Sequence, residues 1–304
     1  MRTPLPSQAG SGQVIGLALL LAWPLAQAQT MTPALSAAPV PSTTAQAAPA
    51  TAPGLPLWEI GALGVAVSQQ AYPGANQQKN GVGVLPYFVY RGKWLRADRD
   101  TLGLRAINTP RIKLDVGFAG ALGSSSADVT VRQGMPDLGT LVEFGPRLRI
   151  ELSDPAQRSN GRWRLDLPVR GVFDLSDGFK QRGVSFEPRL VFDRRSNYGL
   201  SYSASVSAVV GNQRLNDTFY GVAPAYATAA RPAYQAQSGL VAVRAGVSAS
   251  YRFNPDWQLF TYARIDSVAG AANRNSPLVQ RNTGATVGIG LSYTLARSSS
   301  RAID

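Results

Sequence analysis

Apolar and polar residues alternate along most of the chain after residue 57. In the segment 285–295, for example, every second residue is apolar and the residues between are Gly, Ser or Thr. Successive side chains of a β-strand point to opposite faces, so this pattern predicts strands with one apolar and one polar face. Such segments lie at 57–70, 82–91, 111–121, 139–152, 161–174, 183–194, 197–210, 240–253, 256–267 and 284–296.

The length of these segments favours a membrane barrel over a soluble β-sandwich, which alternation alone would also fit. Strands of soluble proteins average about 5–6 residues, and these segments are about twice as long. Aromatic residues such as Trp58, Tyr87, Trp163 and Tyr251 stand near segment ends, as in the aromatic girdles at membrane interfaces. We therefore predict an all-β fold, an antiparallel transmembrane β-barrel in the outer membrane of a bacterium.

The number of strands depends on residues 93–106. Two short apolar stretches, 93–97 and 102–106, would add two strands to the ten long segments. Bacterial single-chain barrels have an even number of strands, so we predict twelve strands, with ten as the alternative. The tight turns at 195–197 and 254–256 are predicted to be periplasmic, and the long connections 211–239 and 268–283 to lie outside.

The chain before the barrel has two predicted parts. An apolar run at 14–23 follows Arg2 and precedes Ala26-Gln27-Ala28, which predicts a cleavable signal peptide at 1–28. Residues 29–56 are mostly Ala, Pro, Thr and Ser and predict a flexible linker. The predicted barrel is 57–296, and 297–304 form a C-terminal tail.

Two residue types are missing, and their absence narrows the function. The chain has no Cys and no His, which excludes thiol nucleophiles, Ser-His-Asp relays and the usual zinc ligand sets. We therefore predict a protein that is not an enzyme and has no cofactor, and we assign no catalytic, cofactor-binding or metal residue. The net charge is +12, but the charges are spread along strands of an exported protein, which argues against nucleic-acid binding.

Opposite charges occupy the polar face of several central segments. Neighbouring strands would bring these charges together inside the barrel, where they would pair and fill a narrow lumen. The predicted lumen ion network consists of Glu143, Arg147, Arg149, Glu151, Arg162, Arg164, Asp166, Arg170, Asp174, Glu187, Arg189 and Asp193. The serines at 201, 203, 205 and 207 are predicted to be a lumen wall of small residues, with a sugar-binding strip as the alternative.

Several motifs carry a family resemblance. They are Leu85-Pro86-Tyr87-Phe88-Val89-Tyr90-Arg91-Gly92, Asp217-Thr218-Phe219-Tyr220-Gly221-Val222, Pro232-Ala233-Tyr234 and Asn275-Ser276-Pro277-Leu278-Val279. In order and spacing the chain resembles the MipA/OmpV family of outer-membrane proteins, from about Trp58 to Leu295. The resemblance implies a scaffold that brings a membrane-bound lytic transglycosylase together with a murein synthase. Other members of the family are adhesin-like or antigenic surface proteins.

The first functional hypothesis is therefore a scaffold in outer-membrane lipid, and the alternatives are a small diffusion channel or an adhesin-like surface protein. Asp217, Phe219, Tyr220 and Tyr234 lie in the longest predicted outside loop, where recognition residues are often placed. They form the predicted recognition loop, although the same residues could instead fold the loop over the mouth of the barrel.

Overall fold

The structure is a computed structural model that describes residues 55–91, 95–97, 102–104, 107–121, 123–154, 161–195 and 199–302. The predicted signal peptide and almost all of the predicted linker lie outside the described residues. So do residues 196 and 197 of one predicted periplasmic turn.

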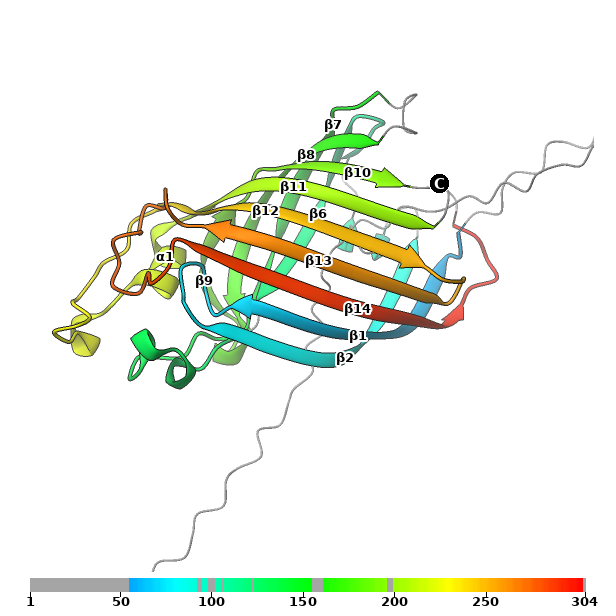
Figure 1. Cartoon of the computed structure of the whole chain (residues 1–304). Helices are drawn as coiled ribbons and strands as arrows, with labels where there is room; N and C mark the ends of the chain where they lie inside the picture. Colours follow the sequence, from blue (N-terminus) through cyan, green and yellow to red (C-terminus); the bar gives the residue numbers. More distant parts are fainter. Residues whose placement is uncertain are drawn as a thin grey trace, which may run out of the picture.

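The described residues form one sheet of strand segments with a few short helices (Figure 1). The strand segments are β1 (Trp58–Gln70), β2 (Gln78–Arg91), β3 (Leu95–Ala97), β4 (Leu102–Leu104), β5 (Ile107–Asn108), β6 (Ile112–Ala121), β7 (Leu141–Glu151), β8 (Arg162–Asp174), β9 (Lys180–Phe186), β10 (Arg189–Arg195), β11 (Leu200–Gly211), β12 (Gly239–Arg252), β13 (Trp257–Ser267) and β14 (Thr283–Arg297). The helices are η1 (Ser126–Asp128), η2 (Thr130–Arg132), η4 (Leu175–Asp177), α1 (Gln213–Tyr220) and η5 (Pro224–Tyr226). No helix in the described ranges is long and apolar enough to cross a membrane.

The sheet is antiparallel and closes into a barrel. Its strand order is β4-β3-β2-β1-β14-β13-β12-β11-β10-β8-β7-β6-β5, and β9 pairs with both β8 and β11. If β4 and β5 count as one strand, and β9 and β10 as another, the described residues contain twelve strands. The prediction of an antiparallel barrel with twelve strands is confirmed.

One predicted strand, 183–194, is divided into β9 and β10. Both pieces pair with β8 on one side and β11 on the other, so the direction of the strand is kept. The interruption falls at Glu187 and Pro188. A proline has no backbone N–H for the ladder, which explains why the pairing stops there.

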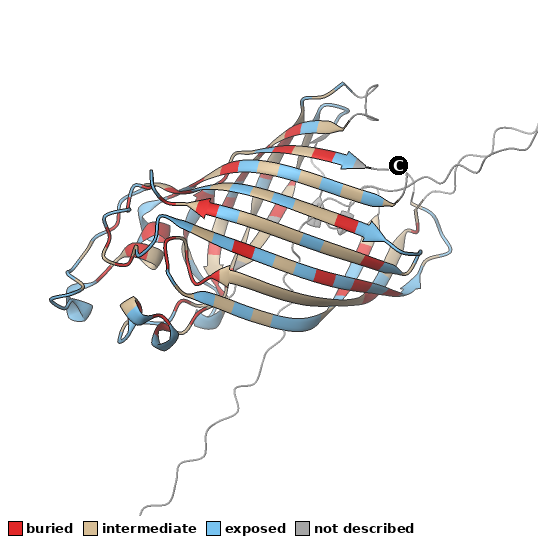
Figure 2. Ribbon diagram, in the orientation of Figure 1, coloured by how far each residue is buried: buried red, intermediate tan, exposed pale blue. Residues whose placement is uncertain are grey.

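The two faces of the sheet have different exposure (Figure 2). Along β14, the outward Val287 and Ile289 are 51% and 52% exposed, whereas the inward Thr286 and Ser292 are 2% exposed. Aromatic pairs lie near both ends of the outer surface, for example Trp257–Tyr293 with centroids 4.6 Å apart and Phe144–Phe173 at 4.9 Å. This is the apolar band with aromatic girdles of an outer-membrane barrel.

Tyr87 is not part of a girdle. It pairs across the ladder with Gly61 and faces the lumen, where it is buried and its hydroxyl lies 2.6 Å from the Thr294 hydroxyl. A Cβ at Gly61 would lie 2.6 Å from the Tyr87 ring. The ring therefore occupies the space above a glycine on the next strand, which alternation within β2 alone could not reveal.

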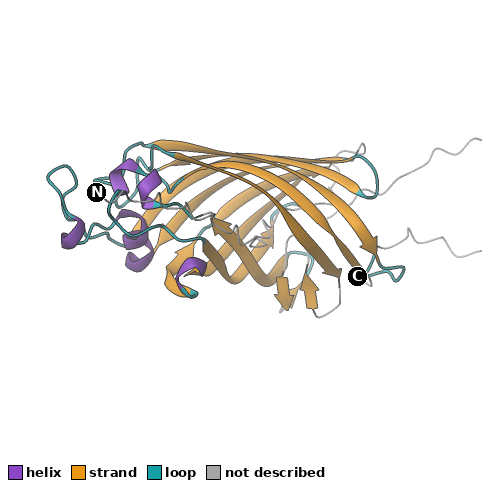
Figure 3. Cartoon of the chain, turned by 90° about the horizontal axis from the view of Figure 1, so that it is seen from below, coloured by secondary structure: helices purple, strands orange, loops and turns teal. Residues whose placement is uncertain are grey.

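The two ends of the barrel differ. The turn end carries the start of β1, the end of β14 and the tight turn at 254–256. The loop end carries the connections 71–77, 123–140, 212–238 and 268–282, and the helices gather there (Figure 3). After β14 the predicted tail runs beside the start of β1, because Leu57 N donates to Ser300 O and Ala302 N to Leu55 O.

Candidate functional site: the lumen, its loop cap and the turn-end pocket

One side of the lumen, lined by β6, β7, β8 and β10, carries paired charges, and we name it the charged wall. At the β6–β7 ladder, Arg147 donates from Nε and Nη2 to the two oxygens of Asp115, at 2.8 and 2.9 Å. Both side chains are less than one-tenth exposed. This two-pronged geometry is the strongest form of an Arg–carboxylate contact.

The next carboxylates of the charged wall are each shared by two arginines. Asp166 lies 3.2 Å from Arg149 and 3.3 Å from Arg164. Asp193 accepts from Arg164 and lies 3.5 Å from Arg162. Arg162 also lies 3.8 Å from Glu151 of β7.

Glu187, at the break between β9 and β10, is the centre of a second cluster. Its carboxylate lies 2.9 Å from Arg189, 3.1 Å from Arg170 and 3.5 Å from Arg244 of β12. The Ser207 hydroxyl donates to the same carboxylate at 3.0 Å. Arg170 also lies 3.6 Å from Glu143.

Asp174 sits apart from these clusters, at the loop end of β8. It pairs with Arg182 at 2.7 Å and accepts from Ser176 N, which caps η4. Each residue of the predicted lumen ion network thus has an ion-pair partner in the structure.

Sequence reasoning left five partners out of the network: Asp115, Arg182, Arg244, Arg264 and Asp266. Asp115, Arg244, Arg264 and Asp266 occupy polar positions of predicted strands. Their phase was therefore the signal that could have found them. Chemically, these carboxylates are engaged by one or more guanidinium groups, an arrangement that suits structure better than proton transfer.

The opposite side of the lumen is apolar. Ladder partners place seven apolar side chains on the inward face, and we name them the apolar wall: Leu63, Val65 and Val67 of β1, Leu85 and Tyr87 of β2, and Phe260 and Tyr262 of β13. Nothing in the sequence placed these residues in the lumen, because an inward apolar residue breaks the alternation that identifies a strand face.

At the loop end, the four long connections pack into one buried cluster, which we name the loop cap. Its buried apolar residues are Ala71, Tyr72, Ala75, Val129, Leu138, Val209, Tyr220, Val222, Ala236, Val241 and Leu278. The connections start from strands spread around the sheet, so their contact with one another carries the cap across the mouth of the barrel.

Hydrogen bonds between connections hold the loop cap. Tyr72 Oη donates to Leu278 O at 2.7 Å, and Tyr220 Oη to Pro73 O at 3.0 Å. Burial raises the pKa of Tyr72 to about 12, an effect partly opposed by the Arg132 guanidinium, which lies 5.8 Å from the ring centroid. Burial also raises the pKa of Tyr220 above its ordinary value.

The residues of the predicted recognition loop lie in this cap. Tyr220 is 1% exposed and Phe219 packs against the same cluster. Asp217 Oδ1 accepts from Ala236 N at 2.8 Å, and Tyr234 Oη donates to Asn273 Oδ1 at 3.2 Å. The structure thus places these side chains in contacts that fold the loop.

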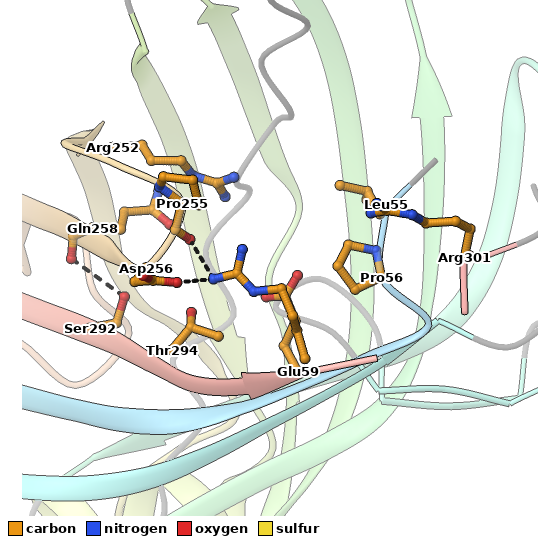
Figure 4. A pocket seen from close by; sticks show the side chains of 11 residues that line it. Leu55, Pro56, Glu59, Arg252, Pro255, Asp256, Gln258, Ser292, Thr294 and Arg301 are labelled. Carbon is orange, nitrogen blue, oxygen red and sulfur yellow. Dashed lines mark hydrogen bonds and ion pairs between the residues drawn. The ribbon is translucent and has the colours of Figure 1, made fainter. Parts of the chain in front are cut away.

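At the turn end, a pocket of about 190 Å³ opens beside the start of β1 (Figure 4). Arg252 and Arg301 line it, together with Arg297, which pairs with Asp256 and donates to Pro255 O at 3.2 Å. Glu59 also lines it and pairs with Arg91 at 3.0 Å. Neither Arg252 nor Arg301 has an ion-pair partner among the described residues, so the pocket presents positive charge.

The chain is similar to several solved structures, at low identity and low TM-score. The NanC porin is 11% identical with a TM-score of 0.36, and the match covers 78% of this chain and 100% of that one. Outer membrane phospholipase A from Escherichia coli is 12% identical with a TM-score of 0.34, over 77% of this chain and 92% of that one. No curated protein has a matching sequence.

The family resemblance and the predicted location are confirmed. The family model described as MltA-interacting protein MipA matches residues 61–295, which is nearly the whole barrel and includes both lumen walls and the loop cap. The chain therefore belongs to the MipA family, and it is a β-barrel of the bacterial outer membrane.

Proposed function

We propose that this barrel is a non-enzymatic scaffold that brings a lytic transglycosylase and a murein synthase together at the outer membrane. The observation that carries the proposal is the match to a family described as MltA-interacting protein over residues 61–295. The composition supports it, because a chain without Cys or His lacks the usual nucleophile relays. The paired carboxylates of the charged wall support it further, since they are poor general acids.

The turn end is the proposed docking surface. Short turns of outer-membrane barrels face the periplasm, where peptidoglycan enzymes work, and the loop cap occupies the other end. Arg252 and Arg301 at the turn-end pocket provide charges for an acidic surface of a partner. Charges at the rim of an interface mainly steer association and set specificity.

Affinity purification from detergent-solubilised envelope tests this proposal. We expect the tagged protein to recover both enzymes, and Arg252→Glu with Arg301→Glu to lower their recovery about tenfold, or about 1.4 kcal/mol. Arg281→Glu, an exposed charge reversal at the loop end, is the matched control and should leave recovery unchanged. Recovery of neither enzyme by the unaltered protein would refute the scaffold.

The orientation needs its own test. An epitope inserted at Ala225, in the exposed η5 of the loop end, should be labelled on intact cells. An epitope at Pro255, in the turn between β12 and β13, should be labelled only after the membrane is opened. The reverse pattern would move the docking surface to the outside and exclude periplasmic partners.

A small diffusion channel is the second candidate, and one observation favours it. A Cβ added to Gly83 of β2 would have no atom within 4 Å, so the lumen has free space beside the apolar wall. Conductance across a planar bilayer separates the channel from the scaffold.

A further inference from the structure

The rings of the apolar wall on β13 lie over glycines of the next strand. Phe260 faces Gly290 and Tyr262 faces Gly288 across the β13–β14 ladder. A Cβ on either glycine would come within 2.8 or 2.9 Å of the ring beside it. The rings therefore occupy the space above the bare backbone of β14 that a side chain at either glycine would fill.

Beside the rings, the wall continues across β1 and β2 without filling the space in front of it. Val65 is the ladder partner of Gly290 on one side and of Gly83 on the other. Val65 and Leu85 face inward but are only partly buried, and the position of Gly83 opens onto free space. Interiors of transmembrane barrels are usually polar, so this exposed apolar surface is unfavourable in water, at about 25 cal/mol per Å².

A positive group adjoins the loop-end side of the wall. Arg264 stands two residues beyond Tyr262 on β13 and therefore on the same face. Its Nε lies 2.9 Å from Asp266 Oδ1, and Nε of Arg244 lies 3.3 Å from the same oxygen. Arg264 Nη2 also donates to Asp266 Oδ2 at 3.0 Å. One carboxylate thus neutralises two guanidinium groups, whose side chains are 30% and 21% exposed and can meet a ligand in the lumen.

The neighbouring carboxylates do not neutralise the positive charge of Arg244 and Arg264. Arg244 also reaches Glu187, at 3.5 Å, but Glu187 is shared with Arg170 and Arg189. This part of the lumen therefore combines an apolar surface with a local excess of positive charge.

We propose that the lumen binds an anionic amphiphile with a single alkyl chain. The chain lies along the apolar wall, which from Leu63 to Val67 is about 13 Å long at about 3.3 Å per residue. The anionic head lies at Arg264 and Arg244 and contacts the exposed parts of their guanidinium groups. Binding removes the apolar wall from water and supplies the negative charge that the two arginines lack.

Direct binding of dodecanoate to the protein in phosphatidylcholine nanodiscs tests the proposal, with empty nanodiscs as the blank. We expect the wild type to bind dodecanoate saturably. Val65→Asn should bind it about tenfold more weakly. Gly290→Val should have a similar effect, because the added side chain pushes the Phe260 ring into the lumen. Arg264→Gln should weaken dodecanoate about tenfold and leave dodecanol unchanged. The matched control is Val84→Ala. Val84 is the outward neighbour of Gly83 and is 74% exposed, so this variant should bind dodecanoate as the wild type does.

Cysteine protection keeps the test independent of any folding defect. The chain has no cysteine, so Gly83→Cys and Val84→Cys each carry one thiol, the first facing the lumen and the second facing lipid. Dodecanoate should slow modification of Gly83→Cys by a water-soluble thiol reagent. It should not slow modification of Val84→Cys by an apolar reagent.

Two results would overturn the assignment. The first is the absence of saturable binding together with the absence of protection at Gly83→Cys. The second is binding that is equal for dodecanol and dodecanoate and unaffected by Arg264→Gln, since the anionic head would then have no role.

Discussion

The charged wall and the apolar wall line the same lumen in opposite ways. On the charged wall, long side chains reach across the ladder and satisfy one another, as Arg147 and Asp115 do. On the apolar wall, rings lie over glycines and leave space in front of Val65 and Gly83. The difference teaches that one half of this barrel is filled by its own residues, whereas the other half retains room for a ligand.

The largest effect is expected on the charged wall. Arg164 is 4% exposed and pairs with both Asp166 and Asp193. Arg164→Ala leaves two buried carboxylates without this partner, which should lower the free energy of unfolding by about 3–5 kcal/mol. The midpoint of heat modification, read as the shift between the folded and unfolded bands on a gel, should fall.

Lys180→Ala is the matched control for that variant. Lys180 and Asp177 also form an ion pair, at 3.4 Å, but both side chains are more than half exposed. Exposed pairs contribute about 0–1 kcal/mol, so the heat-modification midpoint should stay near that of the wild type. Equal effects of the two variants would mean that burial does not distinguish the charged wall from the surface.

The second effect concerns the loop cap and appears at alkaline pH. The pKa of Tyr72 is about 12 in the folded protein against an ordinary value of 10.0. The folded pKa is raised above the unfolded value. Neutral Tyr72 therefore makes its full contribution to the free energy of unfolding below pH 10, and this contribution is lost as the pH rises from 10 to about 12. The loss is at most about 3 kcal/mol.

Phenolate absorbance and protease sensitivity at the loop end should therefore change together in that pH range, while the charged wall stays intact. In Tyr72→Phe the alkaline loss of protease resistance should be smaller. A cap that opens at the same pH in both proteins would assign the transition to other groups, such as Tyr220.

A third and smaller effect concerns one hydrogen bond of the loop cap. Tyr220→Phe removes the donor to Pro73 O and leaves that carbonyl without this bond, which should cost about 1–3 kcal/mol. Hydrogen exchange should increase in residues 71–77 and not in the strands of the charged wall. Thr218→Val is the control, because its hydroxyl bonds only within α1 and at the surface.

The smallest effect is expected at the turn end. Arg297 pairs with Asp256, and the two side chains are 35% and 47% exposed. Arg297→Ala should lower the free energy of unfolding by less than about 1 kcal/mol, visible as a small shift in urea unfolding from vesicles. A loss as large as that of Arg164→Ala would show that the turn end, rather than the charged wall, stabilises the barrel.

The charged wall could be predicted because its charges recur at every second position of consecutive strands, as Arg147 and Arg149 do on β7. Asp115 and Asp266 carry the same phase, each with one charge two positions before it, Lys113 and Arg264, but their strands do not continue the repeat and sequence reasoning left them out. The apolar wall could not be predicted, because Val65 and Val67 obscure the two-residue period of β1. The loop cap has no period at all, and its core depends on contacts between connections far apart in sequence.

Planar-bilayer recording of the purified wild-type protein tests the central claim most directly, namely that paired charges and the loop cap close this barrel to free diffusion. We expect no steady conductance of porin size at neutral pH. A steady, open and ion-selective conductance of that size in the wild type would contradict it and establish the channel instead.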